Sequence, residues 1–199
     1  MIVVVGSKGY LGSKVTKILK KNFINVIEYE KIIKFKKFIY QTYVIYLKKP
    51  KNNIKSLKII LIKFLSQNPK LKFLYISSLS VYGLSATDRI INLNSEFSPH
   101  SDYAFNKIKE ETYLRKIKTI YKKFQPIIVR CPIIYSNHHD NQHKIFNFLL
   151  KLNIPLPLDI SSNKRAYLLL ENFLSFVVHI VKSKVKHYEF LICEKKNLS

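Results

Sequence analysis

The stretch MIVVVGSKGYLGSKVTKILKK, residues 1–21, passes from an apolar run directly into an amphipathic helical pattern. The run Ile2 to Val5 is apolar throughout, which predicts a strand buried on both faces of a parallel sheet. Three of the four glycines follow it, at Gly6, Gly9 and Gly12. Glycine at such a turn lets a pyrophosphate approach the backbone, and the first N–H groups of the helix point at it. The stretch predicts a dinucleotide-binding strand, turn and helix, although a tight turn alone would have the same glycines.

Strand-like and helical segments alternate along the chain as far as Arg130. This order predicts an α/β fold, a doubly wound parallel sheet with right-handed crossovers. We expect residues 1–135 to form the dinucleotide-binding part. After Arg130 the rhythm breaks, and residues 136–199 are expected to form a reduced substrate lobe, interleaved with late sheet elements in a single compact domain. Besides the first strand and helix, the expected strands are 25–29, 43–47, 73–77 and 126–130, and the expected helices are 31–40, 54–65, 101–123 and 144–152.

The charge is strongly positive, with 35 Lys plus Arg against 12 Asp plus Glu and a formal net charge of +23. Such an excess attracts nucleic acid, an anionic membrane face or an anionic substrate. The lysines, however, are spread from Lys8 to Lys196, and only four cations are arginine. Lysine-rich surfaces without arginine clusters read bases poorly, so we favour a solvated surface and do not expect a nucleic-acid partner.

The cysteines and the apolar runs indicate the cellular compartment and whether a segment spans a membrane. Cys131 and Cys193 are expected to be unpaired core residues of a cytoplasmic protein, and the opening residues do not read as a leader. The longest apolar stretch, 166–181, is interrupted by polar residues and falls short of about 18 clean apolar residues. We therefore expect a buried helix there and no transmembrane segment.

An acidic residue, Glu30, stands at the end of the second expected strand, eighteen residues past Gly12. A carboxylate in that place accepts both ribose hydroxyls of an adenosine and repels a 2′-phosphate, which favours NAD over NADP. Lys31 and Lys34 lie nearby and could instead accept a phosphate.

A serine-ended strand is followed by a tyrosine and a lysine at helical spacing. The strand lies in YISSLSVYG, residues 75–83, and Tyr103 comes twenty-five residues after Ser78. Tyr103 and Lys107 are at positions i and i+4 and share one helix face. A lysine beside a phenol is expected to lower its pKa from about 10, so that the phenol exchanges a proton with a substrate oxygen. The Ser78 hydroxyl could hold the same oxygen.

These motifs resemble the NAD-dependent epimerase/dehydratase family of extended short-chain dehydrogenases/reductases, from Met1 to about Cys193. The resemblance implies a Rossmann-like fold and hydride transfer to or from a nucleotide-activated sugar. Within the family, the chain is similar to bacterial UDP-sugar 4-epimerases and 4-keto-sugar reductases. The stretches that carry it are GSKGYLG (6–12), YISSLSVYG (75–83), SPHSDYAFNK (98–107), VRCPIIYS (129–136) and NKRAYLLLENFLSFV (163–177).

The resemblance also implies residue roles. Tyr103 would be the acid/base, Lys107 the activator of the phenol, and Ser78 and Ser80 contacts to the substrate. Arg165 would hold the nucleotide diphosphate, although it could equally pair with Glu171. Leu79 and Ser80 stand where dehydratases of the family have Asp and Glu, which disfavours dehydration. The implied contacts to NAD come from Gly6, Gly9, Tyr10, Leu11, Gly12, Glu30, Tyr103 and Lys107.

Some features depart from the family pattern. Few residues separate Glu30 from Tyr43, so the sheet is expected to lose an edge strand. Lys48 and Lys49 replace two alanines, and helices that complete the substrate lobe are not expected in this chain. These departures keep open an alternative, a degenerate dehydrogenase-like module that binds RNA, a membrane surface or a protein partner.

Two further features have simple explanations. The histidine-rich segment 138–143 is expected to be a polar loop, and we expect no metal site. The amphipathic segment 54–65 packs against the sheet or pairs with its twin in a homodimer.

Overall fold

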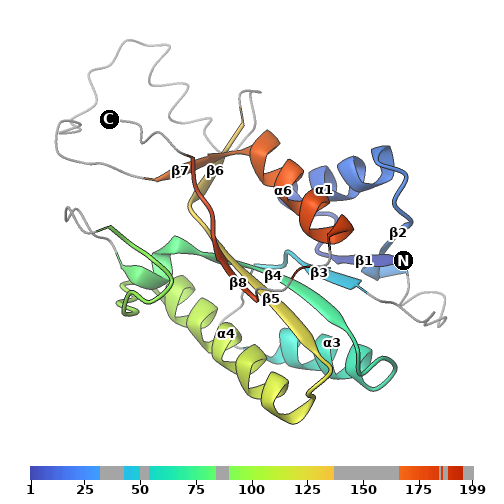
Figure 1. Ribbon diagram of the computed structural model, residues 1–199, viewed down its shortest axis with the longest axis horizontal. Helices are drawn as coiled ribbons and strands as arrows, with labels where there is room; N and C mark the ends of the chain where they lie inside the picture. The colour runs from blue at the N-terminus through green and yellow to red at the C-terminus, as the bar shows by residue number, and fades with distance from the viewer. Residues whose placement is uncertain are drawn as a thin grey trace.

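The computed structural model describes residues 1–31, 43–49, 54–83, 90–136, 166–183, 185 and 188–194. Within them, six parallel strands form one sheet in the order β2-β1-β3-β4-β5-β8, and β6 and β7 form a separate parallel pair (Figure 1). The strands are β1 (Ile2–Val5), β2 (Val26–Glu28), β3 (Tyr43–Tyr46), β4 (Lys72–Ser78), β5 (Gln125–Cys131), β6 (Ile133–Tyr135), β7 (Tyr167–Leu169) and β8 (Glu189–Leu191).

Helices cover both faces of this sheet. Helices α1 (Tyr10–Lys21) and α6 (Leu170–Lys182) lie on one face, and α3 (Lys55–Leu65) and α4 (Asp102–Ile120) lie on the other (Figure 1). A short 3-10 helix, η1 (Leu79–Tyr82), follows β4 directly. The architecture is therefore the expected doubly wound α/β fold of Rossmann type.

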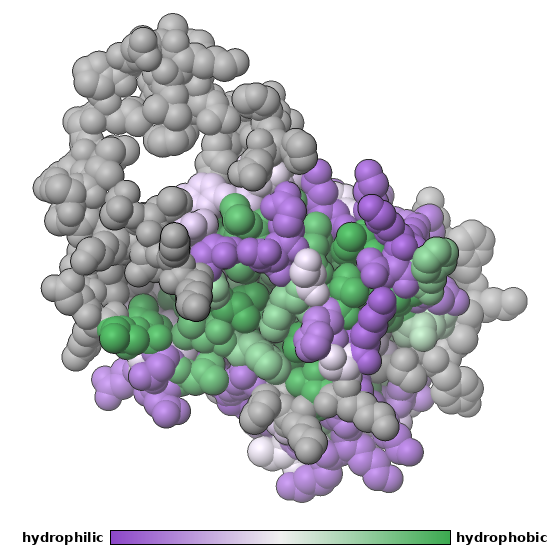
Figure 2. All heavy atoms as spheres, turned by 45° about the horizontal axis from the view of Figure 1, so that its top comes forward, coloured by the Kyte–Doolittle hydropathy of each residue, from purple (hydrophilic) through white to green (hydrophobic). Residues whose placement is uncertain are grey.

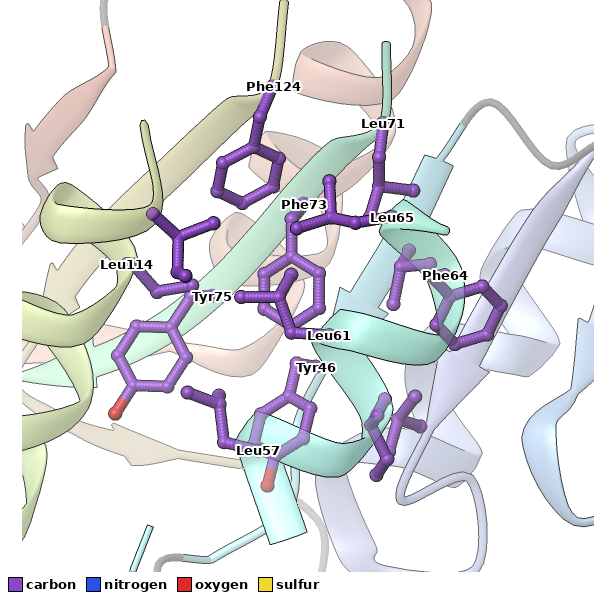
Figure 3. Packing of buried hydrophobic residues seen from close by; sticks show 14 of the residues in the cluster. Tyr46, Leu57, Leu61, Phe64, Leu65, Leu71, Phe73, Tyr75, Leu114 and Phe124 are labelled. Carbon is purple, nitrogen blue, oxygen red and sulfur yellow. The ribbon is translucent and has the colours of Figure 1, made fainter. Parts of the chain in front are cut away.

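The strands feed two hydrophobic cores because successive side chains point to opposite faces. In β1, Val3 and Val5 join the core under α3 and α4, whereas Ile2 and Val4 join the core under α1 and α6. Figure 3 shows the first core, in which aromatic rings of the strands meet leucines of α3 and Leu114 of α4. The continuous apolar runs of the sequence are explained by burial on both faces.

Most expected elements are confirmed, with boundaries that differ by at most three residues. The exception is 166–181, where the expected single helix is wrong for its first part, since β7 precedes α6. Tyr167–Leu169 pairs in parallel register with β6, so its backbone hydrogen bonds go to a strand rather than into a helix. The segments 32–42 and 144–152, with their expected helices, lie outside the described residues.

Figure 2 shows the hydropathy of one face of the molecule. Hydrophilic side chains lie in several groups over the visible face, interspersed with apolar ones, rather than in a single patch (Figure 2). In the described ranges, no helix combines the length and the apolar character that a bilayer crossing requires.

Candidate active site

The turn after β1 is built around close backbone contacts. Gly6 has φ +87°, a conformation that side chains rarely adopt. A Cβ added to Gly12 would lie 1.9 Å from the Gly6 carbonyl oxygen, so only glycine fits there. Gly9 donates its N–H to that same oxygen at 3.0 Å and caps α1 without any side-chain hydrogen bond. The turn thus presents backbone and the positive end of α1, which suits the phosphates of a dinucleotide.

Glu30 lies beside this turn, bonded to Ser7. The Ser7 hydroxyl donates to Glu30 Oε2 at 2.9 Å and is also 3.4 Å from Glu28 Oε2. Lys31 pairs with Glu28 at 3.0 Å and holds the pKa of that carboxyl below its usual range. The Lys31 ammonium is therefore engaged by a carboxylate, and Lys34 lies outside the described residues.

Tyr10 and Leu11 begin α1 directly after Gly9, both half-buried, so they lie at the same turn. The end of β3 approaches it from the other side, since an added Cβ on Gly6 would lie 3.2 Å from the Lys48 nitrogen. Lys48 is half-buried and Lys49 is exposed. The residues around the turn fit a dinucleotide. Without side chains on the glycines, a diphosphate can come close to the backbone, and the Glu30 carboxylate can accept hydrogen bonds from a ribose.

Ser78 is the last residue of β4 and caps η1. Its Oγ accepts hydrogen bonds from the Ser80 N–H at 3.2 Å and the Ser80 hydroxyl at 3.0 Å. The Tyr103 phenol lies near enough for Ser78 to oppose the rise of its pKa. The structure therefore brings Ser78, Ser80 and Tyr103 together beyond the carboxyl end of β4, where ligands of open α/β sheets bind.

Lys107 is fixed beneath Tyr103. Both side chains come from α4, whose first turn is capped by Ser101 through a 3.2 Å hydrogen bond from the Ala104 N–H. The Lys107 ammonium donates to the Ile76 carbonyl oxygen at 2.7 Å and lies 5.7 Å from the centre of the Tyr103 ring. Lys107 is 4% exposed and Tyr103 as a whole residue is 43% exposed, so the lysine is buried beneath a partly exposed tyrosine.

The pKa values differ from the sequence expectation. Burial raises the pKa of Tyr103 to about 12, and Ser78 opposes this shift, whereas Lys107 is not among the causes. Burial also lowers the pKa of Lys107 to about 8. The expectation that Lys107 lowers the pKa of Tyr103 therefore finds no support in these contacts, among which burial has the largest effect. At neutral pH the phenol is protonated and suited to donate a proton.

A buried ion-pair network, missed by sequence reasoning, supports these elements. Glu111 is fully buried and accepts hydrogen bonds from Arg130 at 2.7 Å, from Arg115 at 2.9 Å and from the Ser77 hydroxyl at 2.5 Å. Glu189 of β8 pairs with both arginines. The network joins β4, α4, β5 and β8 behind the site. The sequence spacing could have indicated one member of this network, because Glu111 lies four residues after Lys107 and therefore shares its helix face.

Two expected features cannot be placed. Arg165 and the segment 138–143 lie outside the described residues. In the ranges that the structure does describe, no group of three or more His, Cys, Asp or Glu side chains is arranged to hold a metal ion. The same ranges contain two free cysteines. Cys131 is buried at the end of β5, as expected, whereas Cys193 is exposed, so the expectation that it is a core residue is wrong.

Comparison with known proteins gives a family and a fold. The sequence model of the NAD dependent epimerase/dehydratase family matches residues 48–192. No curated protein matches the sequence.

Solved structures resemble the whole chain at low sequence identity. A dTDP-glucose 4,6-dehydratase from Bacillus anthracis, in complex with NAD, has a TM-score of 0.76 at 16% identity, over 100% of this chain and 76% of its own. A UDP-glucuronic acid 4-epimerase from Bacillus cereus with NAD has 0.75 at 16%, over 99% and 79%. A UDP-N-acetylglucosamine 4-epimerase from Bacillus cereus has 0.73 at 18%, over 100% and 80%. These likenesses establish the fold.

Proposed function

Because the chain belongs to the NAD-dependent epimerase/dehydratase family, we propose that it is an NAD(H)-dependent epimerase or 4-keto reductase of a nucleotide-activated sugar. The observation that carries this proposal is the meeting of three groups beyond β4. The Ser78 hydroxyl lies near enough to the Tyr103 phenol to oppose the rise of its pKa, and the Lys107 ammonium lies 5.7 Å from the centre of the Tyr103 ring. A binding module without chemistry has no physical need for this trio.

The dinucleotide would lie along the glycine turn, with its diphosphate at the amino terminus of α1 and a ribose at Glu30. Gly6, Gly9, Tyr10, Leu11 and Gly12 would form this contact. The carboxylate at Glu30 favours NAD over NADP. When bound, the nicotinamide would exchange a hydride with a ring carbon of the sugar.

The chain's own residues would handle the proton. In the reductive direction, the Tyr103 phenol donates its proton to the ketone oxygen, while Ser78 holds that oxygen by a hydrogen bond. The raised pKa of Tyr103 keeps the phenol protonated for this step at neutral pH. Lys107 would contact the nicotinamide ribose and add positive charge beside the oxygen. Ser80 would orient Ser78, to which it donates.

Residues 136–199 would provide the lobe that holds the nucleotide sugar, with Arg165 on its diphosphate. We also propose a homodimer through α3, because Ile59 and Ile62 on this helix are 65% and 53% exposed. Sedimentation of the wild type and of the Ile59→Lys/Ile62→Lys variant tests it. A monomeric wild type would contradict the dimer.

Cofactor binding followed by turnover tests the proposal. Purified protein should change the fluorescence of NADH, and Tyr103→Phe should keep that change while lowering turnover of UDP-hexoses with NAD or NADH by about 10²–10⁴-fold. Tyr113→Phe is the matched control, because it removes a half-buried phenol from the same helix. Its turnover should equal that of the wild type.

The alternative is a dehydrogenase-like module that binds RNA, a membrane surface or a protein partner. The lysines that replace small residues at the end of β3, Lys48 and Lys49, favour it. Absence of any fluorescence change at about 1 mM NADH would point to this alternative. So would tight RNA association that falls steeply with salt.

A further inference from the structure

A buried carboxylate lies behind the trio without a role in the proposed chemistry. Glu110 of α4 is 1% exposed, and the Tyr75 hydroxyl donates to its Oε2 at 2.6 Å. Tyr75 comes from β4, and its ring projects from the strand toward α4 (Figure 3). A buried carboxylate is costly unless its charge is compensated, so this pair requires a physical explanation.

The neighbouring charge is Lys107, three residues earlier on the same helix. Its ammonium lies 4.6 Å from the centre of the Tyr75 ring, close enough for a cation–π interaction. It donates a hydrogen bond to a neutral carbonyl, that of Ile76. None of the ion pairs in the described part of the chain includes Lys107. The ammonium therefore depends on the ring face and on nearby charge rather than on a direct salt bridge.

Glu110 is the buried carboxylate on α4 whose negative charge can compensate the Lys107 ammonium. The other buried carboxylate on the helix, Glu111, is bonded to the guanidinium groups of Arg130 and Arg115. Glu110 has the Tyr75 hydroxyl as its hydrogen-bond partner and belongs to none of these ion pairs. Its negative charge is thus available to Lys107.

We propose that Glu110, held in place by Tyr75, is a positioning residue that keeps the buried Lys107 in its ammonium form and directed at the site. This inference rests on the proposed function, in which Lys107 acts as a cation. Tyr75 contributes twice, because its hydroxyl orients the carboxylate and its ring face receives the ammonium.

The titration behaviour of the groups agrees with this arrangement. Burial lowers the pKa of Lys107 to about 8, and Glu110 is the largest influence in the opposite direction, ahead of Cys131 of β5 and Glu111. Burial raises the pKa of Glu110, while Tyr75 and Lys107 lower it. The remaining titratable groups that face the pair are Tyr103 of α4 and Tyr46 of β3.

The test follows the Lys107 titration directly, without cofactor. In protein carrying 13C-labelled lysine, the NMR resonance that disappears in Lys107→Arg identifies Lys107. We expect its pKa to fall by about one unit in Glu110→Gln, because an opposite charge is lost. Tyr75→Phe should shift it in the same direction, since the carboxylate loses its donor. Glu171→Gln, an exposed carboxylate on α6, is the control and should leave the pKa unchanged.

A single substitution at Tyr75 or Glu110 leaves the other polar group buried without its hydrogen-bond partner and can unfold the protein. A second variant therefore removes both groups. Tyr75→Phe/Glu110→Ala replaces both polar groups with apolar ones, which folded proteins tolerate better than a single loss. It should fold and should also lower the pKa of Lys107. An unchanged Lys107 pKa in a folded Glu110 variant overturns the inference.

The NMR titration tests the charge coupling and the turnover assay tests the proposed function, so either one can be contradicted without the other. With an active enzyme, the high-pH limit of kcat/KM should move to lower pH in Glu110→Gln, in parallel with the Lys107 titration. A Lys107 pKa that shifts in a chain that turns over no sugar nucleotide supports the charge coupling and contradicts the proposed function.

Discussion

The glycine turn and the α4 end of the site are built in opposite ways. The turn after β1 depends on the absence of side chains, since Gly12 has the Gly6 carbonyl oxygen where its Cβ would be. The α4 end depends on long side chains, with Glu111, Arg130 and Lys107 buried against β4 and β5. Sterics therefore limit the first region, where any added atom is harmful. Charge balance limits the second, where we expect loss of one partner to be harmful and loss of both to be tolerated.

The largest expected effect tests charge balance. Arg130→Met leaves Glu111 with one of its two guanidinium partners, and Glu111 is 0% exposed. We expect a loss of about 3–5 kcal/mol in the free energy of unfolding, measured by urea denaturation. Arg130→Met/Glu111→Leu removes the central pair together and should recover most of this loss. A double variant as unstable as the single one would contradict the comparison.

Two glycines of the turn after β1, Gly12 and Gly9, allow a matched test of the steric limit. Gly12→Ala places a Cβ 1.9 Å from the Gly6 oxygen, whereas the same change at Gly9 has a single contact at 3.3 Å. We expect Gly12→Ala to cost about 1–3 kcal/mol in unfolding free energy and to weaken NADH binding, because the turn must open. Gly9→Ala should cost less on both measures. Equal costs would show that backbone contact does not limit this turn.

The buried lysine predicts a pH dependence. The pKa of Lys107 is lowered from its ordinary 10.5 to about 8, so the unfolded chain binds more protons between these values. Stability contributed by this group is therefore lowest at low pH and rises as the pH increases from 8 toward 10.5. The unfolding free energy of the wild type minus that of Lys107→Met should rise over pH 8 to 10. A flat difference would show that Lys107 titrates normally.

The smallest effect concerns Glu189, at the partly exposed edge of the network. Its pairs with Arg115 and Arg130 hold the pKa of this carboxyl below its usual 4.5, against the effect of burial. The stabilisation is present above pH 4.5 and is lost as the pH falls through the lowered value. Glu189→Gln should cost about 1–2 kcal/mol at pH 7 and progressively less in acid, by denaturation at each pH. A cost that stays constant with pH would contradict the charge assignment.

The contrast between the two regions also explains what sequence analysis could reach. Helices and strands were predictable from apolar runs, and the shared helix face of Tyr103 and Lys107 from their i, i+4 spacing, because these are regular local patterns. Tyr75–Glu110 and Arg130–Glu111 were not predicted. Their partners are 35 and 19 residues apart and meet only because α4 packs across β4 and β5. The start of β7 was missed for the same reason, since its partner strand is distant along the chain.

By itself, the sequence determined the α/β order of elements, the glycine turn and the family, since each follows from residue type and spacing over short distances. Only the tertiary structure decided how the buried charges are paired and which way the pKa values of Tyr103 and Lys107 move. These depend on burial and on neighbours from other strands and helices. Proton affinity reflects the surroundings of a group in three dimensions, and spacing along the chain does not specify those surroundings.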